Sequence, residues 1–185
     1  MSTPKVAVLG GGVMGTTVAS AVLAAGWAGA DVTVAEPRAE RRAELTAEHR
    51  VATAESAAEA VAGAGVVVVA VKPNQVGAVL EEVAPALEAD VVVVTVAAGL
   101  AAAFYEERLP AGTPVVRVMP NTPAVIGKGA SAVAPGAHAS EEHVALTERL
   151  LASTGLVVRV AEKDLDAVTA VSGSGPAYVF YVIDA

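Results

Sequence analysis

The chain has 185 residues, of which 54% are hydrophobic and 17% are charged, and its formal net charge is −8. This composition excludes a disordered protein, and the acidic balance argues against broad nucleic-acid binding. The longest valine-rich run, residues 66–71, is far too short to cross a bilayer. The chain has no cysteine and no signal-peptide pattern at its N-terminus, so we expect a cytoplasmic protein.

Short apolar strands alternate with helical segments along most of the sequence. The expected strands cover residues 5–9, 31–37, 66–73, 91–99, 113–120, 129–136 and 156–160. The expected helices cover residues 13–25, 38–49, 55–64, 75–87, 102–109 and 140–154. Ser140 is the expected N-cap of the last of these helices. The alternation predicts βαβ units, and therefore an α/β fold with a Rossmann-like, mainly parallel sheet and helices on both faces.

Residues 161–185 depart from this alternation. They read as a helical turn, a Ser/Gly break at residues 172–175, and an apolar helix that begins near Pro176. That helix is still apolar where the sequence stops. We therefore expect residues 1–160 to form one domain and residues 161–185 to be the start of a second domain that is cut off. The Ser/Gly segment is expected to be a flexible turn that joins the two.

A glycine cluster follows the first expected strand directly. Gly10, Gly12 and Gly15 fit the pattern G-x-G-x-x-G between a strand and a helix. In that context the first glycine permits a tight turn, the second lets the backbone approach a pyrophosphate, and the third allows close helix–strand packing. The N–H groups at the start of a helix then favour phosphate. The pattern predicts a dinucleotide site, and a glycine-rich turn without a ligand is the weaker alternative.

Glu36 lies at the end of the second expected strand and follows Gly15 by about 20 residues. This distance is typical of an acid that hydrogen-bonds the adenosine ribose. An acid at this position favours NADH. Arg38 follows closely and would suit the 2′-phosphate of NADPH instead. Arg41 and Arg42 are expected to pair with Glu40 and Glu44 on the same solvated helix. The expected cofactor is therefore NADPH or NADH.

Motifs at the later strand ends carry the most specific information. AVKP (70–73), VAAG (96–99) and RVMPNTPA (117–124) each follow a valine-rich strand, and open α/β sheets bind ligands at the carboxyl ends of their strands. Together with GGGVMG (10–15) and DAVTAVSGSGPAY (166–178), they resemble pyrroline-5-carboxylate reductase along the whole chain. The resemblance implies an NAD(P)H-dependent oxidoreductase that reduces 1-pyrroline-5-carboxylate to L-proline, the last step of proline biosynthesis.

The resemblance also assigns residues to the cofactor and the substrate. The implied cofactor-binding residues are Leu9, Gly10, Gly11, Gly12, Val13, Met14, Glu36, Arg38, Ala70, Val71, Lys72, Pro73, Val96, Ala97 and Ala98. The expected substrate residues are Met119, Pro120, Asn121 and Glu162. No catalytic side chain is assigned, because hydride transfer to a protonated imine needs mainly an oriented cofactor.

Three side chains in or beside these motifs have alternative interpretations. Lys72 is interpreted as a loop residue near the cofactor rather than a Schiff-base nucleophile. Asn121 lies between two prolines and either binds the carboxamide or substrate, or caps its own turn. Arg117 is interpreted as a partly buried structural residue rather than a clamp for a carboxylate. The three histidines lack metal-ligand spacing, so we expect no metal site.

Members of the resembled family pair a Rossmann domain with an all-helical domain that forms dimers and larger rings. The resemblance implies that residues 1–160 are the dinucleotide-binding Rossmann domain and that residues 161–185 are the start of a truncated helical dimerisation domain. The resemblance implies a homodimer or larger ring at full length, a small-molecule substrate, and neither a nucleic-acid nor a membrane partner. It also implies that the 185-residue chain alone is inactive, because the family's downstream Gly-Gly-Thr loop for the substrate carboxylate is missing. Two other functions stay open: a dehydrogenase of the 3-hydroxy acid type, and a dinucleotide-binding module without catalysis.

Overall fold

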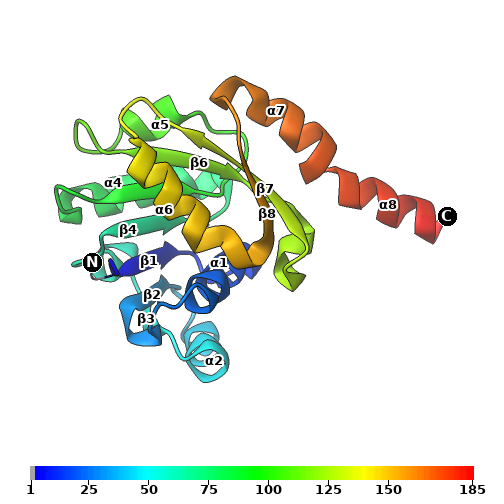
Figure 1. Cartoon of the computed structure of the whole chain (residues 1–185). Coiled ribbons are helices and arrows are strands. Elements are labelled where there is room, and N and C mark those ends of the chain that lie inside the picture. Colours follow the sequence, from blue (N-terminus) through cyan, green and yellow to red (C-terminus); the bar gives the residue numbers. More distant parts are fainter. Residues whose placement is uncertain (1–2) are drawn as a thin grey trace.

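The computed structural model describes residues 3–185, which form an open sheet covered by helices and a helical arm that projects from it (Figure 1). The strands are β1 Val6–Leu9, β2 Val32–Ala35, β3 Ala52–Ala54, β4 Val66–Val69, β5 Val92–Thr95, β6 Val115–Met119, β7 Gly129–Pro135 and β8 Gly155–Arg159. The helices are α1 Val13–Ala24, α2 Ala39–His49, α3 Ala57–Ala60, α4 Val76–Val83, α5 Ala102–Glu106, α6 Glu141–Leu151, α7 Leu165–Val168 and α8 Gly175–Asp184.

The sheet has the order β3-β2-β1-β4-β5-β6-β7-β8. Strands β1 to β6 run parallel to one another, β7 is antiparallel to β6, and β8 is parallel to β7. The mainly parallel sheet predicted from the alternation is therefore confirmed. The strand order reverses between β1 and β4, and open α/β sheets bind ligands beyond the carboxyl ends of the strands at such a switch point.

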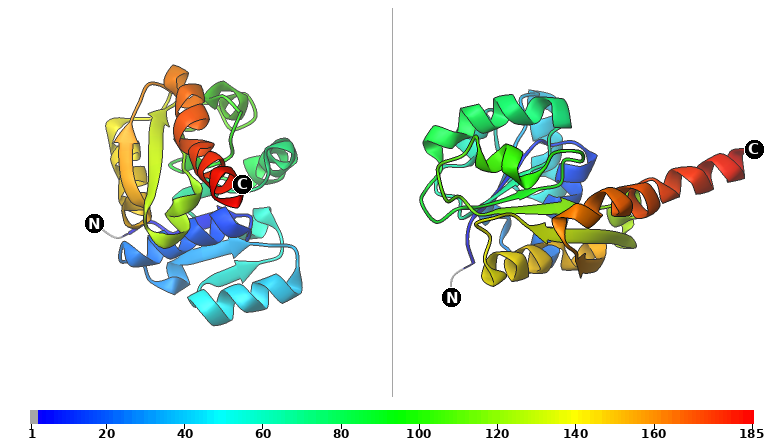
Figure 2. Two further views of the ribbon diagram at one scale, coloured as in Figure 1. Left: turned by 90° about the vertical axis from the view of Figure 1, so that its right-hand side faces the viewer. Right: turned by 90° about the horizontal axis from the view of Figure 1, so that it is seen from above.

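The apolar strands pack into a separate core on each face of the sheet. Val6 and Val8 of β1 point into the core that contains α1 and α6, whereas Ala7 and Leu9 point into the core that contains α3, α4 and α5. Figure 2 shows helices on both faces. Because successive side chains of a strand point to opposite faces, a continuous valine run fills both cores at once.

Two local features show how well the sequence predicts helix and strand boundaries. Ser140 is the N-cap of α6 as expected, and its backbone N–H donates to His143 Nδ1 at 3.0 Å. Strand β3 was not expected, because three residues with one alanine at each end carry no strand pattern. It forms by pairing with β2, where Thr33 to Ala35 lie opposite Ala52 to Ala54.

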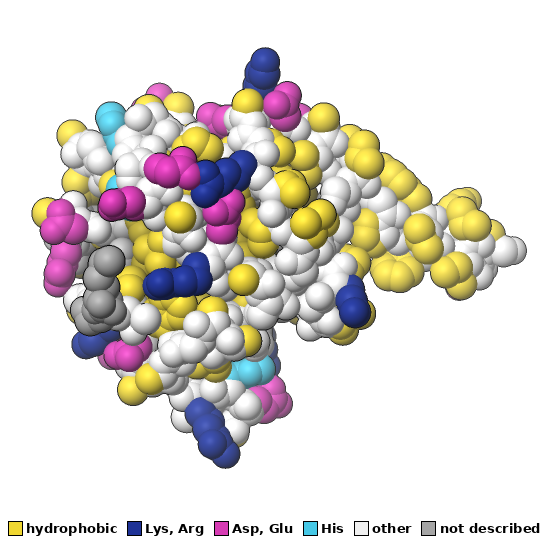
Figure 3. All heavy atoms as spheres, in the orientation of Figure 1, with side chains coloured by type: hydrophobic (Ala, Val, Ile, Leu, Met, Phe, Trp, Pro, Cys, Tyr) yellow, Lys and Arg dark blue, Asp and Glu magenta, His cyan; other side chains and the backbone are white. Residues whose placement is uncertain are grey.

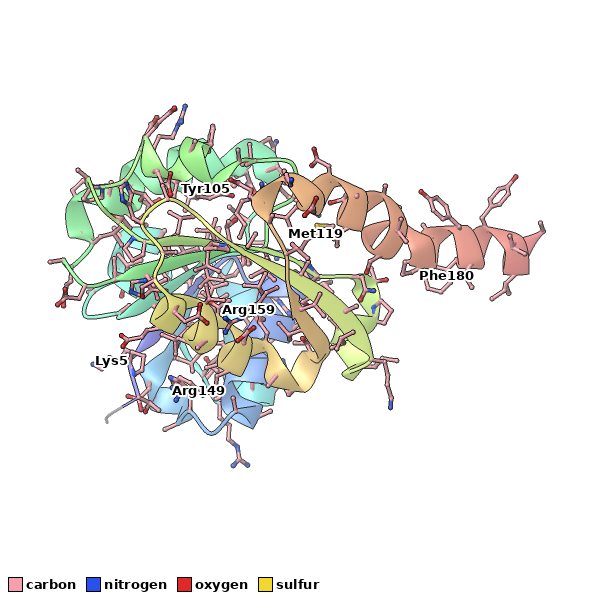
Figure 4. The ribbon with its side chains drawn as sticks, turned by 45° about the horizontal axis from the view of Figure 1, so that its top comes forward. Lys5, Tyr105, Met119, Arg149, Arg159 and Phe180 are labelled. Atoms are coloured by element: carbon pink, nitrogen blue, oxygen red, sulfur yellow. The ribbon has the colours of Figure 1, made fainter. Side chains whose placement is uncertain are left out.

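The expected flexible turn at residues 172–175 is wrong. Residues Thr169–Gly173 form a π-helical turn that continues α7 into α8, and the Ser174 N–H donates to the Thr169 carbonyl oxygen at 2.9 Å. A Cβ atom on Gly173 would lie 2.6 Å from Met119 Cε, so this glycine permits close packing against the end of β6. Figure 4 shows Met119 beneath this part of the arm. The Ser/Gly segment is therefore part of a continuous helical arm.

Helix α8 extends the arm away from the sheet and exposes its apolar side chains (Figure 3). Tyr181 and Ile183 are each 77% exposed, and Phe180 is 65% exposed. Contiguous apolar surface of this kind marks a site of interaction in most proteins. Within residues 3–185, no helix is both long enough and apolar enough to cross a membrane.

We expect Tyr105→Phe to lower the free energy of unfolding by about 1 kcal/mol, the usual net contribution of a buried hydrogen bond. Tyr105 is fully buried, its hydroxyl lies 2.6 Å from Thr95 Oγ1, and burial raises its pKa. Urea unfolding at neutral pH measures the change. Tyr181→Phe is the control, since that ring is exposed, and equal losses in the two variants would contradict the assignment.

Candidate functional site

The glycine loop lies at the carboxyl end of β1 and leads directly into α1. Gly10 has a φ of 110°, in the left-handed region that favours glycine, and its N–H donates to the Ala35 carbonyl oxygen at 3.0 Å. A Cβ atom on Gly15 would overlap the Gly10 carbonyl oxygen. The tight turn expected at Gly10 and the close packing expected at Gly15 are both confirmed.

Gly12 differs from the other two glycines, because nothing inside the protein requires it. Its φ of −74° and ψ of −175° suit any residue, and no atom lies within 4 Å of a Cβ placed there. Gly12 is the N-cap of α1, yet within the described chain it offers no side-chain cap, and the first turn contains no acid. Within the described chain no side chain caps this turn, and the space beside Gly12 is open, so the loop fits a pyrophosphate group.

Glu36 and Arg38 contact each other at the carboxyl end of β2. Arg38 donates from Nε to Glu36 Oε1 at 2.8 Å, from NH2 to Oε2 at 3.3 Å, and from its backbone N–H to Oε1 at 3.1 Å. The hydrogen bond from the Arg38 guanidinium outweighs burial and holds the pKa of Glu36 below its usual value. The acid expected at the ribose and the cation suited to a 2′-phosphate are thus one ion pair beside the glycine loop.

Arg41 and Arg42 do more than pair with acids on their own helix. Arg41 donates to Glu44 Oε2 at 2.7 Å, as expected, but its Nε also donates to the Gly11 carbonyl oxygen at 3.0 Å. Arg42 contacts neither expected acid: it donates to the Glu36 carbonyl oxygen at 2.9 Å and pairs with Glu55. The sequence pattern contained no signal for these longer-range contacts, because they depend on how α2 packs against the loop.

The later motifs meet the glycine loop along one edge of the sheet. The Ala70 N–H donates to the Leu9 carbonyl oxygen at 2.9 Å, and the Val96 N–H donates to the Val69 carbonyl oxygen at 3.1 Å. The ends of β1, β4 and β5 are therefore adjacent, which brings together the residues predicted to bind the cofactor. Lys72 is exposed at this edge and precedes the short 3-10 helix that starts at Pro73.

Small side chains follow β5 at this edge. Ala97 is buried and Ala98 is exposed. The Ala97 N–H donates to Thr95 Oγ1 at 3.2 Å, and Thr95 contacts Tyr105 across the interior at 2.6 Å. A buried chain of hydrogen bonds therefore fixes the backbone of a segment that is predicted to bind the cofactor.

Asn121 follows β6 and uses its side-chain amide to hold two other segments. Its Oδ1 accepts the Ala130 N–H at 2.9 Å, and its Nδ2 donates to Ser172 Oγ at 3.2 Å. The structure therefore departs from the cap of its own turn that was one alternative for this residue. The side chain therefore joins the segment that follows β6 to β7 and to the helical arm.

Arg117 and Glu162 form an ion pair that fastens the start of the arm to the sheet. Arg117 NH1 donates to Glu162 Oε1 at 2.8 Å, and the same oxygen accepts the Ala102 N–H at 2.6 Å. Burial alone would raise the pKa of Glu162, but these two donors outweigh it and the pKa lies below its usual value. Arg117 is only 12% exposed, which supports its interpretation as a structural residue.

Two protein-family models match the chain. The family described as "NADP oxidoreductase coenzyme F420-dependent" matches residues 5–99, and "Pyrroline-5-carboxylate reductase dimerisation" matches residues 162–185. A curated relative, pyrroline-5-carboxylate reductase of Pseudomonas aeruginosa, is 42% identical over 100% of this chain and 68% of its own length. The enzyme of Mycobacterium tuberculosis H37Rv is 44% identical over 98% of this chain and 63% of its own length. The chain thus spans about two thirds of these relatives.

Solved structures of similar proteins have the same fold. A pyrroline-5-carboxylate reductase from Coxiella burnetii superposes with a TM-score of 0.93 at 29% identity, over 99% of this chain and 68% of that one. The Plasmodium falciparum pyrroline carboxylate reductase with NADP bound gives a TM-score of 0.87 at 27% identity, over 100% and 68% of the two chains.

We expect Gly12→Ala to change the free energy of unfolding by less than about 0.5 kcal/mol, because a methyl group there meets no atom. The same methyl group would occupy the space of a pyrophosphate, so the dissociation constants of NADPH and NADH should rise at least about tenfold. Calorimetric titration and urea unfolding measure the two effects.

Gly15→Ala provides the contrast, since its methyl group would overlap the Gly10 carbonyl oxygen. We expect it to lower the free energy of unfolding by about 2–3 kcal/mol. If Gly12→Ala destabilised the fold as much as Gly15→Ala, or left cofactor binding unchanged, the open position assigned to Gly12 would be wrong.

Proposed function

Because the chain belongs to the pyrroline-5-carboxylate reductase family, we propose that it reduces 1-pyrroline-5-carboxylate to L-proline with a hydride from NADPH or NADH. The observation that carries this proposal is the uncapped N-terminus of α1, which opens beside Gly12 at the switch point of the sheet. Such a position suits the pyrophosphate of a dinucleotide. We place the protein in the cytoplasm, in keeping with the absence of cysteine from its sequence.

The chain's own residues bind and orient the cofactor, which supplies the hydride when bound. Gly12 and the first turn of α1 hold the pyrophosphate, and Glu36 with Arg38 holds the adenosine ribose. The adjacent ends of β4 and β5 support the rest of the cofactor through their backbone. Ala97 and Ala98 have side chains small enough for a flat ring to lie close to the main chain, and Thr95 and Tyr105 keep that segment in place. Orientation at close range supplies most of the rate.

We assign the substrate to the segment that follows β6. Met119 and Pro120 form the wall against which the cyclic imine lies. Asn121 holds this wall in place through its hydrogen bonds to Ala130 and Ser172. We also assign Glu162 to the substrate region, where its carboxylate accepts hydrogen bonds from the Ala102 N–H and from Arg117 and so holds the start of the arm against the sheet. Neither proton transfer nor covalent catalysis is assigned to a side chain.

The helical arm is the proposed surface for self-association. Residues 162–185 match the dimerisation family, and α8 exposes apolar side chains along most of its length. A second copy of the arm would bury this surface. We propose a homodimer or a larger ring built from such dimers for the complete protein.

The activity is tested on the protein purified from its natural source. We expect 1-pyrroline-5-carboxylate to drive oxidation of NADPH or NADH, followed by absorbance, with one proline formed per cofactor oxidised. A panel of 3-oxo acids should give no turnover. Turnover of the 3-oxo acids alone would favour a 3-hydroxy acid dehydrogenase, and cofactor binding without any turnover would favour a binding module.

The ion pair between Glu36 and Arg38 should set the preference between the two cofactors. Removing the guanidinium in Arg38→Gln leaves a carboxylate that repels a 2′-phosphate, so the ratio of the NADPH to the NADH dissociation constant should rise about five- to tenfold. Glu36→Gln should move that ratio the other way. Fluorescence titration measures both constants. Arg108→Gln, on an exposed arginine stacked on Phe104, is the control. If the ratio of the NADPH to the NADH dissociation constant were the same in the wild type and all variants, the assignment of the Glu36–Arg38 pair to cofactor preference would be wrong.

A further inference from the structure

Arg41 reaches from α2 to the glycine loop with every nitrogen of its guanidinium engaged. Its Nε donates to the Gly11 carbonyl oxygen at 3.0 Å, its NH2 to Thr16 Oγ1 at 3.0 Å, and its NH1 to Glu44 Oε2 at 2.7 Å. The Thr16 hydroxyl lies 3.4 Å from the same carbonyl oxygen. The Arg41 side chain is 24% exposed. One side chain therefore links α2, the loop and the first turn of α1.

The position of the Gly11 carbonyl oxygen determines where the next N–H points. The C=O of Gly11 and the N–H of Gly12 belong to one planar peptide unit, and no peptide bond in residues 3–185 is cis. In a trans peptide unit these two groups point in opposite directions. Because Arg41 holds the oxygen toward α2, the Gly12 N–H is turned away from α2. Within the described chain that N–H has no acceptor, and it starts at the open position of the loop.

A peptide unit between two glycines needs such an anchor. Neither residue has a side chain that restricts its φ and ψ, so the unit can rotate at low cost. A rotated unit would present the carbonyl oxygen, instead of the N–H, to an approaching phosphate. Packing already holds Gly11 itself, since a Cβ there would lie 2.8 Å from Leu45 Cδ1. Two donors hold the Gly11 carbonyl oxygen, Arg41 Nε at 3.0 Å and the Thr16 hydroxyl at 3.4 Å. Arg41 makes the shorter bond and also donates to Thr16 Oγ1, so it is the side chain that selects the direction of the peptide unit.

We propose that Arg41 is a positioning residue for the dinucleotide: it holds the Gly11 carbonyl oxygen so that the Gly12 N–H points at the pyrophosphate. It acts through the loop and makes no contact with the cofactor itself. This inference rests on the proposed dinucleotide site. It separates Arg41 from Arg38, which pairs with Glu36 at the ribose end and acts on the 2′-phosphate.

A role of Arg41 at the pyrophosphate and a role at the 2′-phosphate predict different results. NADPH and NADH share the pyrophosphate, but only NADPH has the 2′-phosphate. Arg41→Met keeps an unbranched apolar side chain like the stem of arginine and removes its donors. We expect it to raise the dissociation constants of NADPH and NADH together, each by about tenfold, with their ratio unchanged within twofold. Arg41→Lys retains one donor for Gly11 and should recover most of the affinity. Fluorescence titration of the full chain measures all four constants.

The matched control is Glu44→Gln, which removes the exposed partner of Arg41 and leaves the donor to Gly11 in place. It should change neither dissociation constant by more than about twofold. Thermal unfolding of each variant shows whether the fold is retained. A loss of affinity for NADPH alone in Arg41→Met would mean direct contact with the 2′-phosphate and would overturn the proposal, as would unchanged binding of both cofactors.

A second readout needs no cofactor. Without its anchor the peptide unit exchanges between two orientations, so the Gly12 amide signal in ¹H–¹⁵N spectra should shift and broaden in Arg41→Met and return in Arg41→Lys. An unaltered signal would overturn the proposal. If the wild-type chain bound neither NADPH nor NADH, the proposed function would fail, whereas this spectrum would still decide whether Arg41 orients the loop.

Discussion

The contact between α1 and the turn that follows β1 determines the rest of the site. Gly15 lies so close to the Gly10 carbonyl oxygen that no side chain fits between them. The helix therefore starts directly above the end of the strand, with its first N–H groups over the edge of the sheet where β1, β4 and β5 end. A wider spacing would move those N–H groups away from the ends of β4 and β5. One steric limit thus connects the packing of the fold to the proposed phosphate site.

The parallel sheet brings the remaining motifs to this edge mainly through its main-chain hydrogen bonds. Each strand end is fixed by main-chain hydrogen bonds to its neighbour, as between Ala70 and Leu9. Side chains then hold the segments beyond the strands: Thr95 with Tyr105 behind β5, and Asn121 with Ser172 behind β6. The site is therefore formed largely by backbone, which suits a reaction whose chemistry resides in the cofactor.

Local patterns in the sequence predict the parts of this structure that depend on local physics. Valine runs predict buried strands, the glycine spacing predicts the turn and close packing, and Ser140 predicts a helix start. Strand β3 was not predicted, because its residues have no strand pattern and it forms only by pairing with β2. The role of Arg41 was not predicted, because its hydrogen bond to Gly11 joins residues that are far apart in sequence. The Ser/Gly segment is misleading, since glycine there serves packing against Met119 rather than flexibility.

The π-helical turn at Thr169–Gly173 joins α7 to α8 and sets how far α8 is rotated about the axis of the arm. A π turn contains one residue more than an α-helical turn, and each residue of an α-helix rotates the next by about 100° around the axis. Loss of a single residue here would keep the arm helical but would turn the apolar side of α8 by roughly that angle. The extra residue of the π turn thus determines which way the apolar side of α8 faces relative to the sheet. It therefore also determines the geometry of any assembly through α8.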